Sequence, residues 1–315
     1  MPIPIIIDTD PGIDDALAIA LAVRSSVLRV LAVTTVYGNA PVARTARNAA
    51  HLLERMGVSS IPVYAGATRP LVRELAVAAE THGEEGLGHA AIPAEVTPGR
   101  APRVEAPQAL VQLLAGAEQP VTLVALGPLT NLALALALDR EACSRSVHEI
   151  VWMGGSAGAP GNTTPVSEFN AWCDPEAARC VLESGIPLRM VGLDATRCIF
   201  MGADLVDQLG RHSDPEVRWW ADMWRFYVEF HRRSERLEGC ILNDPLAVAL
   251  LLQPDLGRWQ EMYVEVDCGW GLTRGQTLCD RFGFTGRPAN ASVCLHADGD
   301  TTLRLSLQQG LGVRL

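Results

Sequence analysis

The N-terminal region crowds four carboxylates into eight residues: Asp8, Asp10, Asp14 and Asp15 follow the apolar run of residues 3–7. The dipole of a helix stabilises an acid in its first turn by about 0.3–1 kcal/mol, which accounts for one of the four. The others repel one another at low dielectric, so the cluster predicts a bound cation. No His or Cys stands nearby, and oxygen ligands favour a hard ion such as Ca²⁺. A capped helix with solvated acids is the alternative.

The pattern around these acids predicts a doubly wound α/β fold with a mostly parallel sheet. Short apolar runs alternate with longer segments of helical spacing, as expected for strands that are covered on both faces. The predicted strands are 3–7, 30–35, 61–64, 121–126, 150–153 and 188–193. The predicted helices are 14–23, 43–56, 106–117, 130–138 and 175–183, with Thr130 and Asp174 as N-caps. Ligands bind outside the carboxyl ends of such strands, where the acids fall.

The remainder of the chain, after Leu193, changes character. Two helices are predicted at 215–236 and 244–252, and short strands are expected to finish the chain. We expect this tail to cover the open end of the sheet as a helical C-terminal cap over the site. The polar segments 66–105 and 154–172 are long for connections, which favours functional loops. We expect a single domain over 1–315.

Composition and charge disfavour several classes of protein. A net charge of −10 without a basic, aromatic-rich run disfavours a nucleic-acid partner. No apolar run approaches the roughly 20 residues that span a bilayer, and the N-terminus lacks the pattern of a signal peptide. We therefore expect a cytoplasmic protein without a membrane partner. The eight cysteines lack the two-residue gap of zinc or redox sites, so most are expected to be buried.

Two further stretches could complete a site at the same edge of the sheet. Asn243 and Asp244 precede Pro245 and an apolar helix, where an Asp is usually an N-cap. Residues 126–131 run from a strand end into a helix, and the carbonyl of Leu126 could face the metal. Alone, that stretch is an ordinary strand-to-helix turn.

Taken together, six motifs resemble the nucleoside hydrolase family, of the inosine-uridine-preferring type. They are DTDPGIDDA at 8–16, GPLTNL at 127–132, MGG at 153–155, EFN at 168–170, DPEAA at 174–178 and DP at 244–245. They occur in the family's order and span most of the chain, and the first is nearly diagnostic. The resemblance implies hydrolysis of the N-glycosidic bond of a small-molecule ribonucleoside to free base and ribose. It also implies a homo-oligomer, either a dimer or a tetramer.

The resemblance also implies the site residues. Calcium would be held by Asp10, Asp15, the carbonyl of Leu126 and Asp244, together with a water and the ribose 2′ and 3′ hydroxyls. Asp10 would take the proton of the metal-bound water, which attacks the anomeric carbon. The positions that match substrate-binding residues are Asp14, Asn39, Met153, Asn162, Glu168, Phe169 and Asn170. A turn remains the alternative for Asn39 and Asn162. For Glu168, Phe169 and Asn170 the alternative is a surface loop.

The sequence departs from the family at Asn243, where several members carry a histidine that is thought to protonate the leaving base. An amide cannot be a general acid near neutral pH. We keep Asn243 as a candidate catalytic position and add His82, whose loop resembles the family's mobile lid over the base. Tyr227 is a candidate for contact with the base. It belongs to an aromatic stripe that could equally be core: Trp224, Phe226, Tyr227, Phe230 and His231. Base preference is left open.

Three other interpretations compete with this one. Residues 154–158, GGSAG, fit a serine nucleophile elbow at Ser156, although a loop follows where a helix is required. Asp8 could be the nucleophile of a strand-end aspartate phosphohydrolase, with Asp10 as the acid. Asn243 is compatible with a non-catalytic or specialised ribose-binding homologue.

Overall fold

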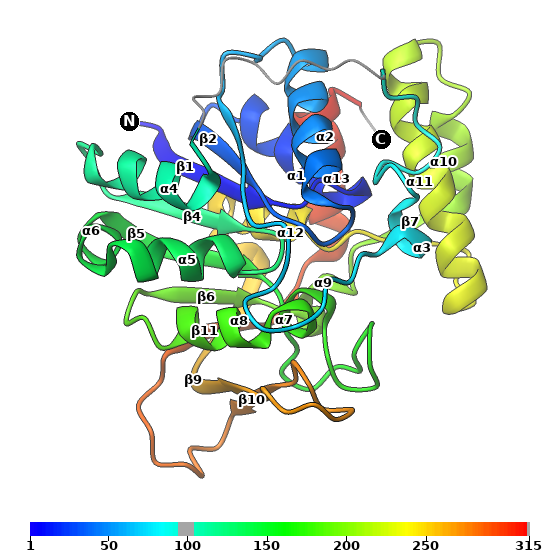
Figure 1. The fold of residues 1–315 in the computed structure, drawn as a ribbon. Coiled ribbons are helices and arrows are strands. Elements are labelled where there is room, and N and C mark those ends of the chain that lie inside the picture. Colours follow the sequence, from blue (N-terminus) through cyan, green and yellow to red (C-terminus); the bar gives the residue numbers. More distant parts are fainter. Residues whose placement is uncertain (94–103, 314–315) are drawn as a thin grey trace.

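The computed structural model describes residues 1–93 and 104–313, and it is organised around one nine-stranded sheet (Figure 1). A separate two-stranded sheet pairs β7 (Phe200–Gly202) with β8 (Gly239–Ile241). The strands of the large sheet are β1 (Ile3–Thr9), β2 (Leu28–Thr35), β3 (Val63–Ala65), β4 (Val121–Ala125), β5 (Val147–Met153), β6 (Leu188–Val191), β9 (Gly257–Val266), β10 (Thr277–Asp280) and β11 (Ala291–Ala297).

The large sheet has the order β10-β9-β11-β6-β5-β4-β1-β2-β3. All neighbouring pairs from β3 to β11 are parallel, whereas β9 and β10 are antiparallel additions at one edge. Ile5 and Ile7 of β1 are fully buried in one hydrophobic core, and Ile6 is fully buried in the other. A strand that is covered on both faces must be apolar throughout, which explains the continuous run at 3–7.

Helices cover both faces of the sheet, which confirms the doubly wound α/β prediction (Figure 1). One core includes residues of α1 (Ile13–Arg24), α2 (Val42–Arg55), α11 (Pro215–Ser234), α12 (Pro245–Leu252) and α13 (Gly299–Leu311). The other includes residues of α4 (Ala106–Ala115), α5 (Thr130–Leu138), α6 (Arg140–Ser146) and α8 (Pro175–Leu182). The short helices are α3 (Ala79–His82), α7 (Phe169–Cys173), α9 (Leu193–Thr196), α10 (Ala203–Leu209) and the 3₁₀ turn Pro254–Leu256.

Of the helices in the described part of the chain, none combines the length and apolar character that crossing a membrane requires.

The order of the strands reverses at β1, which lies between β2 and β4. The chain first builds β2 and β3 on one side of β1 and then crosses to build β4 and β5 on the other. Connecting segments diverge at such a switch point and leave a crevice at the carboxyl ends of the strands. The acids that follow β1 therefore lie at the mouth of this crevice.

The two predicted N-caps have different outcomes. Asp174 caps α8, because its carboxylate accepts the backbone N–H of Ala177 at 3.0 Å. The prediction for Thr130 is wrong, since Leu129 is the capping position and Thr130 is the first residue of α5. The Thr130 hydroxyl instead donates to the Asp174 carboxylate at 2.7 Å. The buried Asp174 carboxylate thus takes the hydroxyl that was predicted to cap the helix, and this hydrogen bond links α5 to the N-cap of α8.

The tail after Leu193 is only partly as predicted. Helix α11 contributes side chains to the mouth of the crevice, as a cap over the site requires. The strands β9, β10 and β11 instead extend the sheet beyond β6, with β11 parallel to β6. The chain ends in α13, which packs against α1, so the prediction of terminal strands is wrong.

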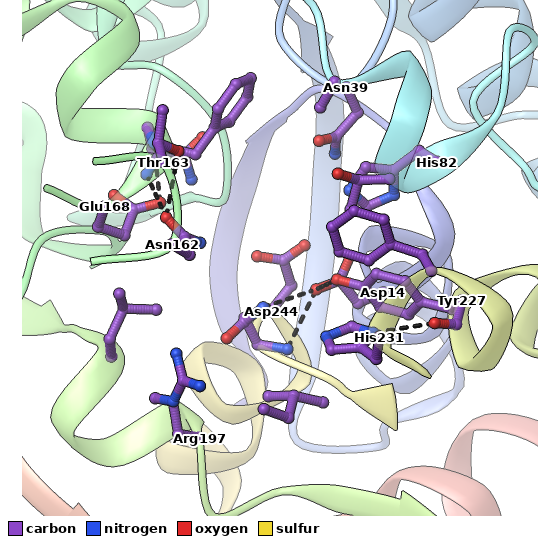
Figure 2. A pocket seen from close by; sticks show the side chains of 18 of the residues that line it. Asp14, Asn39, His82, Asn162, Thr163, Glu168, Arg197, Tyr227, His231 and Asp244 are labelled. Carbon is purple, nitrogen blue, oxygen red and sulfur yellow. Dashed lines mark hydrogen bonds between the residues drawn. The ribbon is translucent and has the colours of Figure 1, made fainter. Parts of the chain in front are cut away.

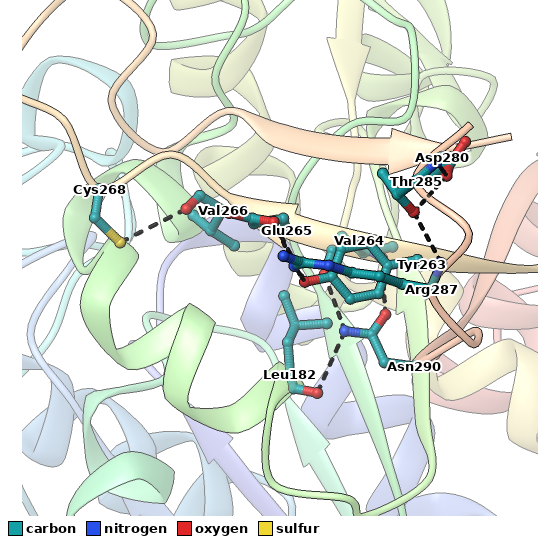
Figure 3. A network of polar contacts seen from close by, with 10 residues as sticks. All are labelled: Leu182, Tyr263, Val264, Glu265, Val266, Cys268, Asp280, Thr285, Arg287 and Asn290. Atoms are coloured by element: carbon teal, nitrogen blue, oxygen red, sulfur yellow. Dashed lines mark hydrogen bonds and ion pairs between the residues drawn. The ribbon is translucent and has the colours of Figure 1, made fainter. Parts of the chain in front are cut away.

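Polar contacts hold the loop that joins β10 to β11 (Figure 3). Asn290 accepts the backbone N–H of Val264 at 2.7 Å and donates to the carbonyl of the same residue at 2.9 Å. Arg287 pairs with Glu265 at 3.1 Å. The side chain of Asn290 thus replaces a strand partner of β9 where β11 has not yet begun.

Candidate active site

A cavity of about 330 Å³ opens at the carboxyl ends of the central strands (Figure 2). This volume is in the range of small-molecule sites. Figure 2 shows Asn162, Thr163 and Glu168 on one side, and His82, Tyr227 and His231 on the other. The predicted residues that line the cavity are Asp14, Asn39, His82, Leu126, Met153, Asn162, Glu168, Phe169, Asn170, Tyr227, Asn243 and Asp244. Asp10 and Asp15 are buried and do not line it.

Three carboxylates lie close together, two of them in the cavity lining and the third, Asp15, buried beside them. Asp14, Asp15 and Asp244 each place one oxygen within 4.8 Å of the others, and all three residues are buried. Burial, followed by repulsion from Asp14, raises the pKa of Asp15 to about 6. Burial, followed by repulsion from Asp15, Asp14 and Asp10, holds the pKa of Asp244 well above its usual value. Such a group of acids is unfavourable unless a cation or protons neutralise it.

Asp10 has one oxygen that the described residues leave without a partner. Its Oδ2 accepts the backbone N–H of Asn39 at 2.7 Å, whereas its buried Oδ1 receives no hydrogen bond from those residues. Burial and then Asp15 hold the pKa of Asp10 well above its usual value. A buried carboxylate oxygen is costly when it is unpaired. This oxygen and the all-oxygen surroundings fit a hard divalent cation.

Hydrogen bonds fix the other acids. Asp15 accepts the Thr9 hydroxyl, the backbone N–H of Gly12 at 2.9 Å and the Asn39 amide at 2.7 Å. Asp14 accepts the backbone N–H of Asn243 at 3.1 Å. Asp244 occupies the N-cap position of α12, as is usual for such an Asp, but its side chain makes no capping bond. Its carboxylate therefore remains with the acidic cluster.

Leu126, whose carbonyl the resemblance implies as a metal ligand, is among the residues that line the cavity. Its carbonyl accepts the Asn170 amide at 2.7 Å, and the same amide donates to the carbonyl of Met153 at 3.1 Å. A carbonyl oxygen has two lone pairs, so this hydrogen bond leaves one of them available. Asn170 thus connects the ends of β4 and β5.

Glu168 and Asn162 shape the loop wall. Glu168 is 2% exposed, so the surface-loop alternative is wrong for this residue. Its two oxygens accept the backbone N–H groups of Gly155 and Asn170, each at 2.8 Å. Burial raises the pKa of Glu168 to about 7. Asn162 accepts the backbone N–H of Phe169 at 2.9 Å, which closes the loop against α7.

The opposite wall carries aromatic rings. His82 is buried, its Nδ1 accepts the backbone N–H of Ile13 at 3.1 Å, and its ring centroid is 5.3 Å from that of Tyr227. Burial lowers the pKa of His82 to about 4. His231 donates from Nδ1 to the carbonyl of Tyr227 at 2.9 Å, and burial also lowers the pKa of His231. Both imidazoles are therefore neutral near neutral pH.

The aromatic stripe of α11 divides between two roles. Trp224 is fully buried in the hydrophobic core. Tyr227, Phe230 and His231 line the cavity. Neither the core nor the site interpretation therefore holds for the whole stripe.

The side chain of Asn243 is already engaged by its neighbours. Its Oδ1 accepts the Thr196 hydroxyl at 2.8 Å, and its Nδ2 lies 3.4 Å from the Asp14 carboxylate. The next residue after Thr196, Arg197, lines the cavity together with Glu235, and neither residue was predicted to do so. The one available signal for Arg197 was its position shortly after the predicted strand 188–193.

Two competing interpretations meet specific obstacles in the structure. The hydroxyl of Ser156 donates to the carbonyl of Ala159 at 2.6 Å, and the chain continues as a loop to residue 168, so no nucleophile elbow forms. Asp8 is buried and does not line the cavity. Its Oδ1 accepts from Thr34 and from Asn131, which makes it a support for the cluster.

Comparisons with known proteins show the family of the chain. The model of the family described as "Inosine-uridine preferring nucleoside hydrolase" matches residues 5–304. The pyrimidine-specific ribonucleoside hydrolase RihA of Shewanella woodyi is 42% identical over 297 residues, which cover 94% of each chain. RihA of Photobacterium profundum is 42% identical over 293 residues, 92% of this chain and 93% of that protein.

Solved structures of nucleoside hydrolases show the same fold. The plant nucleoside hydrolase PpNRh1 superimposes with a TM-score of 0.91 at 32% identity, covering 99% of this chain and 100% of that one. A purine-preferring ribonucleoside hydrolase from Gardnerella vaginalis gives 0.90 at 30% identity, with 98% of each chain covered. Sequence motifs, fold and relatives thus agree, and the chain belongs to the inosine-uridine-preferring nucleoside hydrolase family, whose reaction is the hydrolysis of ribonucleosides.

Proposed function

We propose that the ribose of the substrate binds over the acidic cluster and that Ca²⁺ is held there by Asp10, Asp15, Asp244 and the carbonyl of Leu126. The unpartnered Oδ1 of Asp10 beside three crowded carboxylates is the observation that carries this proposal. Oxygen ligands of this number and charge suit calcium. When bound, the ion would offset the repulsion among the acids and lower the pKa of a water molecule.

The protein groups then divide the work of hydrolysis. Asp10 accepts the proton of the attacking water, because its buried Oδ1 receives no hydrogen bond from the described residues. Asp14, which lines the cavity, stabilises the positive charge that develops on the sugar as the base departs. Asn39, Asn162, Glu168 and the amide of Asn170 surround the hydroxylated ring. A missing hydroxyl would leave such groups unpaired, so deoxyribonucleosides are expected to be poor substrates.

We infer further that the preferred substrates are pyrimidine ribonucleosides. The relatives described as pyrimidine-specific are 42% identical over most of this chain, whereas the purine-preferring structure is 30% identical. His82, Tyr227, Phe230 and Met153 line the cavity and would contact the base. Purine ribonucleosides are the second candidate, since the purine-preferring enzyme shares the same fold.

A panel of pyrimidine and purine ribonucleosides, assayed for released reducing sugar with and without a chelator, tests these assignments. Asp10→Ala is expected to lower kcat/KM by about a hundredfold or more, the usual contribution of a general base. Chelation should lower turnover, and added Ca²⁺ should restore it. The exposed Asp255 provides the matched control, Asp255→Ala. Turnover that ignores both the chelator and Asp10→Ala would exclude this assignment of the site.

We also propose that the chain is a single domain and that it works in the cytoplasm as a homo-oligomer. One sheet carries cores on both faces, as in a single folding unit. The eight cysteines are free thiols, which a reducing compartment maintains. Exposed aromatic side chains near β10, including Phe282 and Phe284, support a contact with a second copy.

A further inference from the structure

Arg197 is the only residue lining the described cavity whose side chain carries a permanent positive charge. The cavity is otherwise acidic, with Asp14, Glu168, Glu235 and Asp244 in its lining. A guanidinium keeps its proton at every pH at which an enzyme works. It can therefore stabilise negative charge but cannot act as a general acid.

Glu235 holds one edge of this guanidinium and leaves the rest free. The Nη2 of Arg197 pairs with Glu235, and the two side chains are 33% and 27% exposed. Within residues 1–93 and 104–313, Nε and Nη1 of Arg197 form no hydrogen bond. In the view of Figure 2, the Arg197 side chain lies below Asn162 and Asp244 and across from His231. Arg197 is thus oriented by one carboxylate while its other donors remain available to a ligand.

Arg197 lines the same cavity as the aromatic side chains that would contact the base. The acidic cluster and its amides form the polar end, where hydroxyls of a sugar fit. Tyr227, Phe230 and His231 of α11 form the aromatic end. Glu235 is the C-cap of α11, and its backbone N–H donates to the carbonyl of His231 at 2.9 Å, so its pairing with Arg197 ties the arginine to this end of α11. The preceding residue is also anchored, because the Thr196 hydroxyl donates to Oδ1 of Asn243 at 2.8 Å.

Breaking the bond to the base requires a group near the base that stabilises it as it leaves. When the bond between C1′ and the base breaks, its electron pair goes to the base nitrogen, which leaves as an anion unless it is protonated. Asn243 has no acidic proton, and the imidazoles of His82 and His231 are neutral. The Tyr227 hydroxyl donates to the Asp14 carboxylate at 3.4 Å, and burial followed by the charge of Asp14 raises the pKa of Tyr227. These side chains therefore hold no readily released proton for the leaving base.

We propose that Arg197, positioned by Glu235, stabilises the negative charge on the departing base. The inference rests on the proposed function. The water oxygen bonds to C1′, its proton passes to Asp10, and the base leaves as an anion beside the guanidinium. The base then takes a proton from the solvent, and Asp10 releases one. Hydrogen-bond donors aimed at developing charge, in a site that excludes water, contribute strongly to enzyme catalysis.

The test compares substrates that differ in leaving group. Uridine has a poor leaving group, whereas 4-nitrophenyl β-D-ribofuranoside releases an anion that is stable without help. Arg197→Gln should lower kcat/KM for uridine by about a hundredfold, the effect of losing one donor to developing charge. The change with the nitrophenyl riboside should stay below about threefold. Arg197→Lys should retain part of the uridine activity, and Glu235→Gln should lower it less than Arg197→Gln does. Arg233→Gln, an exposed arginine on α11, is the control.

The ratio between the two substrates decides the proposal. Equal losses with uridine and the nitrophenyl riboside, or no loss with uridine, would overturn it. A folding defect in Arg197→Gln is recognised by thermal unfolding, and Arg197→Lys, which keeps the charge, then supplies the comparison. Asp10→Ala is expected to lose activity with both substrates. Full activity of Asp10→Ala would count against the proposed function and leave the arginine ratio to be read from the other variants.

Discussion

Glu168 has a structural and a site role in one buried side chain. It accepts backbone N–H groups from Gly155, Asn170 and Ala171, and it also lines the cavity. These donors favour the ionised form, yet burial outweighs them and raises the pKa from 4.5 to about 7. The cost of burying the charge is therefore larger than the gain from three backbone donors.

The raised pKa of Glu168 predicts a pH dependence of stability. The unfolded carboxyl loses its proton near pH 4.5, whereas the folded one keeps it until about pH 7. The stabilising contribution is thus complete below pH 4.5 and is lost as the pH rises to about 7. Urea unfolding in the presence of chelator should show a fall of up to about 3 kcal/mol that can be attributed to this group. Glu168→Gln should flatten that part of the profile. The exposed control Glu183→Gln should leave it intact, and an unchanged profile in Glu168→Gln would contradict the assignment.

Single residues differ in how well the sequence reveals them. Asp10, Asp14 and Asp15 are recognisable in the sequence because several acids after an apolar strand repel one another unless a cation neutralises them. Arg197 gives no such signal, since an arginine beyond a strand is usually solvated. Its role depends on Glu235, 38 residues later, and the pairing appears only when α9 and α11 are packed together.

The turn after β2 leaves room for the Asp10 carboxylate because residue 38 is a glycine. Gly38 has φ +155°, and a Cβ on it would lie 1.9 Å from Oδ2 of Asp10. Gly38→Ala should displace this carboxylate and lower kcat by about a hundredfold, because small misplacements of catalytic groups cost that much. The control is Gly57→Ala, where φ is also positive but no atom lies within 4 Å of the new Cβ. It should cost about 1 kcal/mol of stability and no activity. Full activity in Gly38→Ala would show that this close approach is unnecessary.

The elements were predictable where burial dictates composition. The strands from β1 to β6 are apolar runs, because helices cover both of their faces, and their predicted positions overlap those observed. Strand β9 was missed because it lies near the edge of the sheet and mixes exposed with buried residues. The short helix α9 was missed because four residues cannot show a helical period.

At the scale of the molecule, the parallel pattern indicated the fold class and the edge of the sheet that carries the site. It could not indicate how far the sheet extends. The three last strands join it through contacts that are distant in sequence, with Ser292 of β11 opposite Arg189 of β6. That pairing depends on the packed core rather than on a local pattern.

The antiparallel edge of the sheet also exposes large apolar side chains to solvent, which is unfavourable unless another protein surface covers them. Trp270, Leu272, Phe282 and Phe284 are 77%, 77%, 81% and 89% exposed. The rings of Phe282 and Phe284 lie 5.7 Å apart, on the loop that Asp280, Arg287 and Asn290 hold in place (Figure 3). Patches of this kind mark contacts between proteins. We therefore expect this loop to lie in the interface between copies of the chain.

The double variant Phe282→Ser, Phe284→Ser should consequently shift the protein to a smaller assembly at equal concentration, as measured by sedimentation or light scattering. Its thermal unfolding should change little when the assembly is absent, because neither ring contributes to the buried core. Leu138→Ser, which removes an exposed apolar side chain at the end of α5, should leave the mass unchanged. A monomeric wild-type protein would refute the oligomer. An unchanged mass in the double variant would place the interface on another face, since two aromatic anchors that are lost from an interface normally weaken it by several kcal/mol.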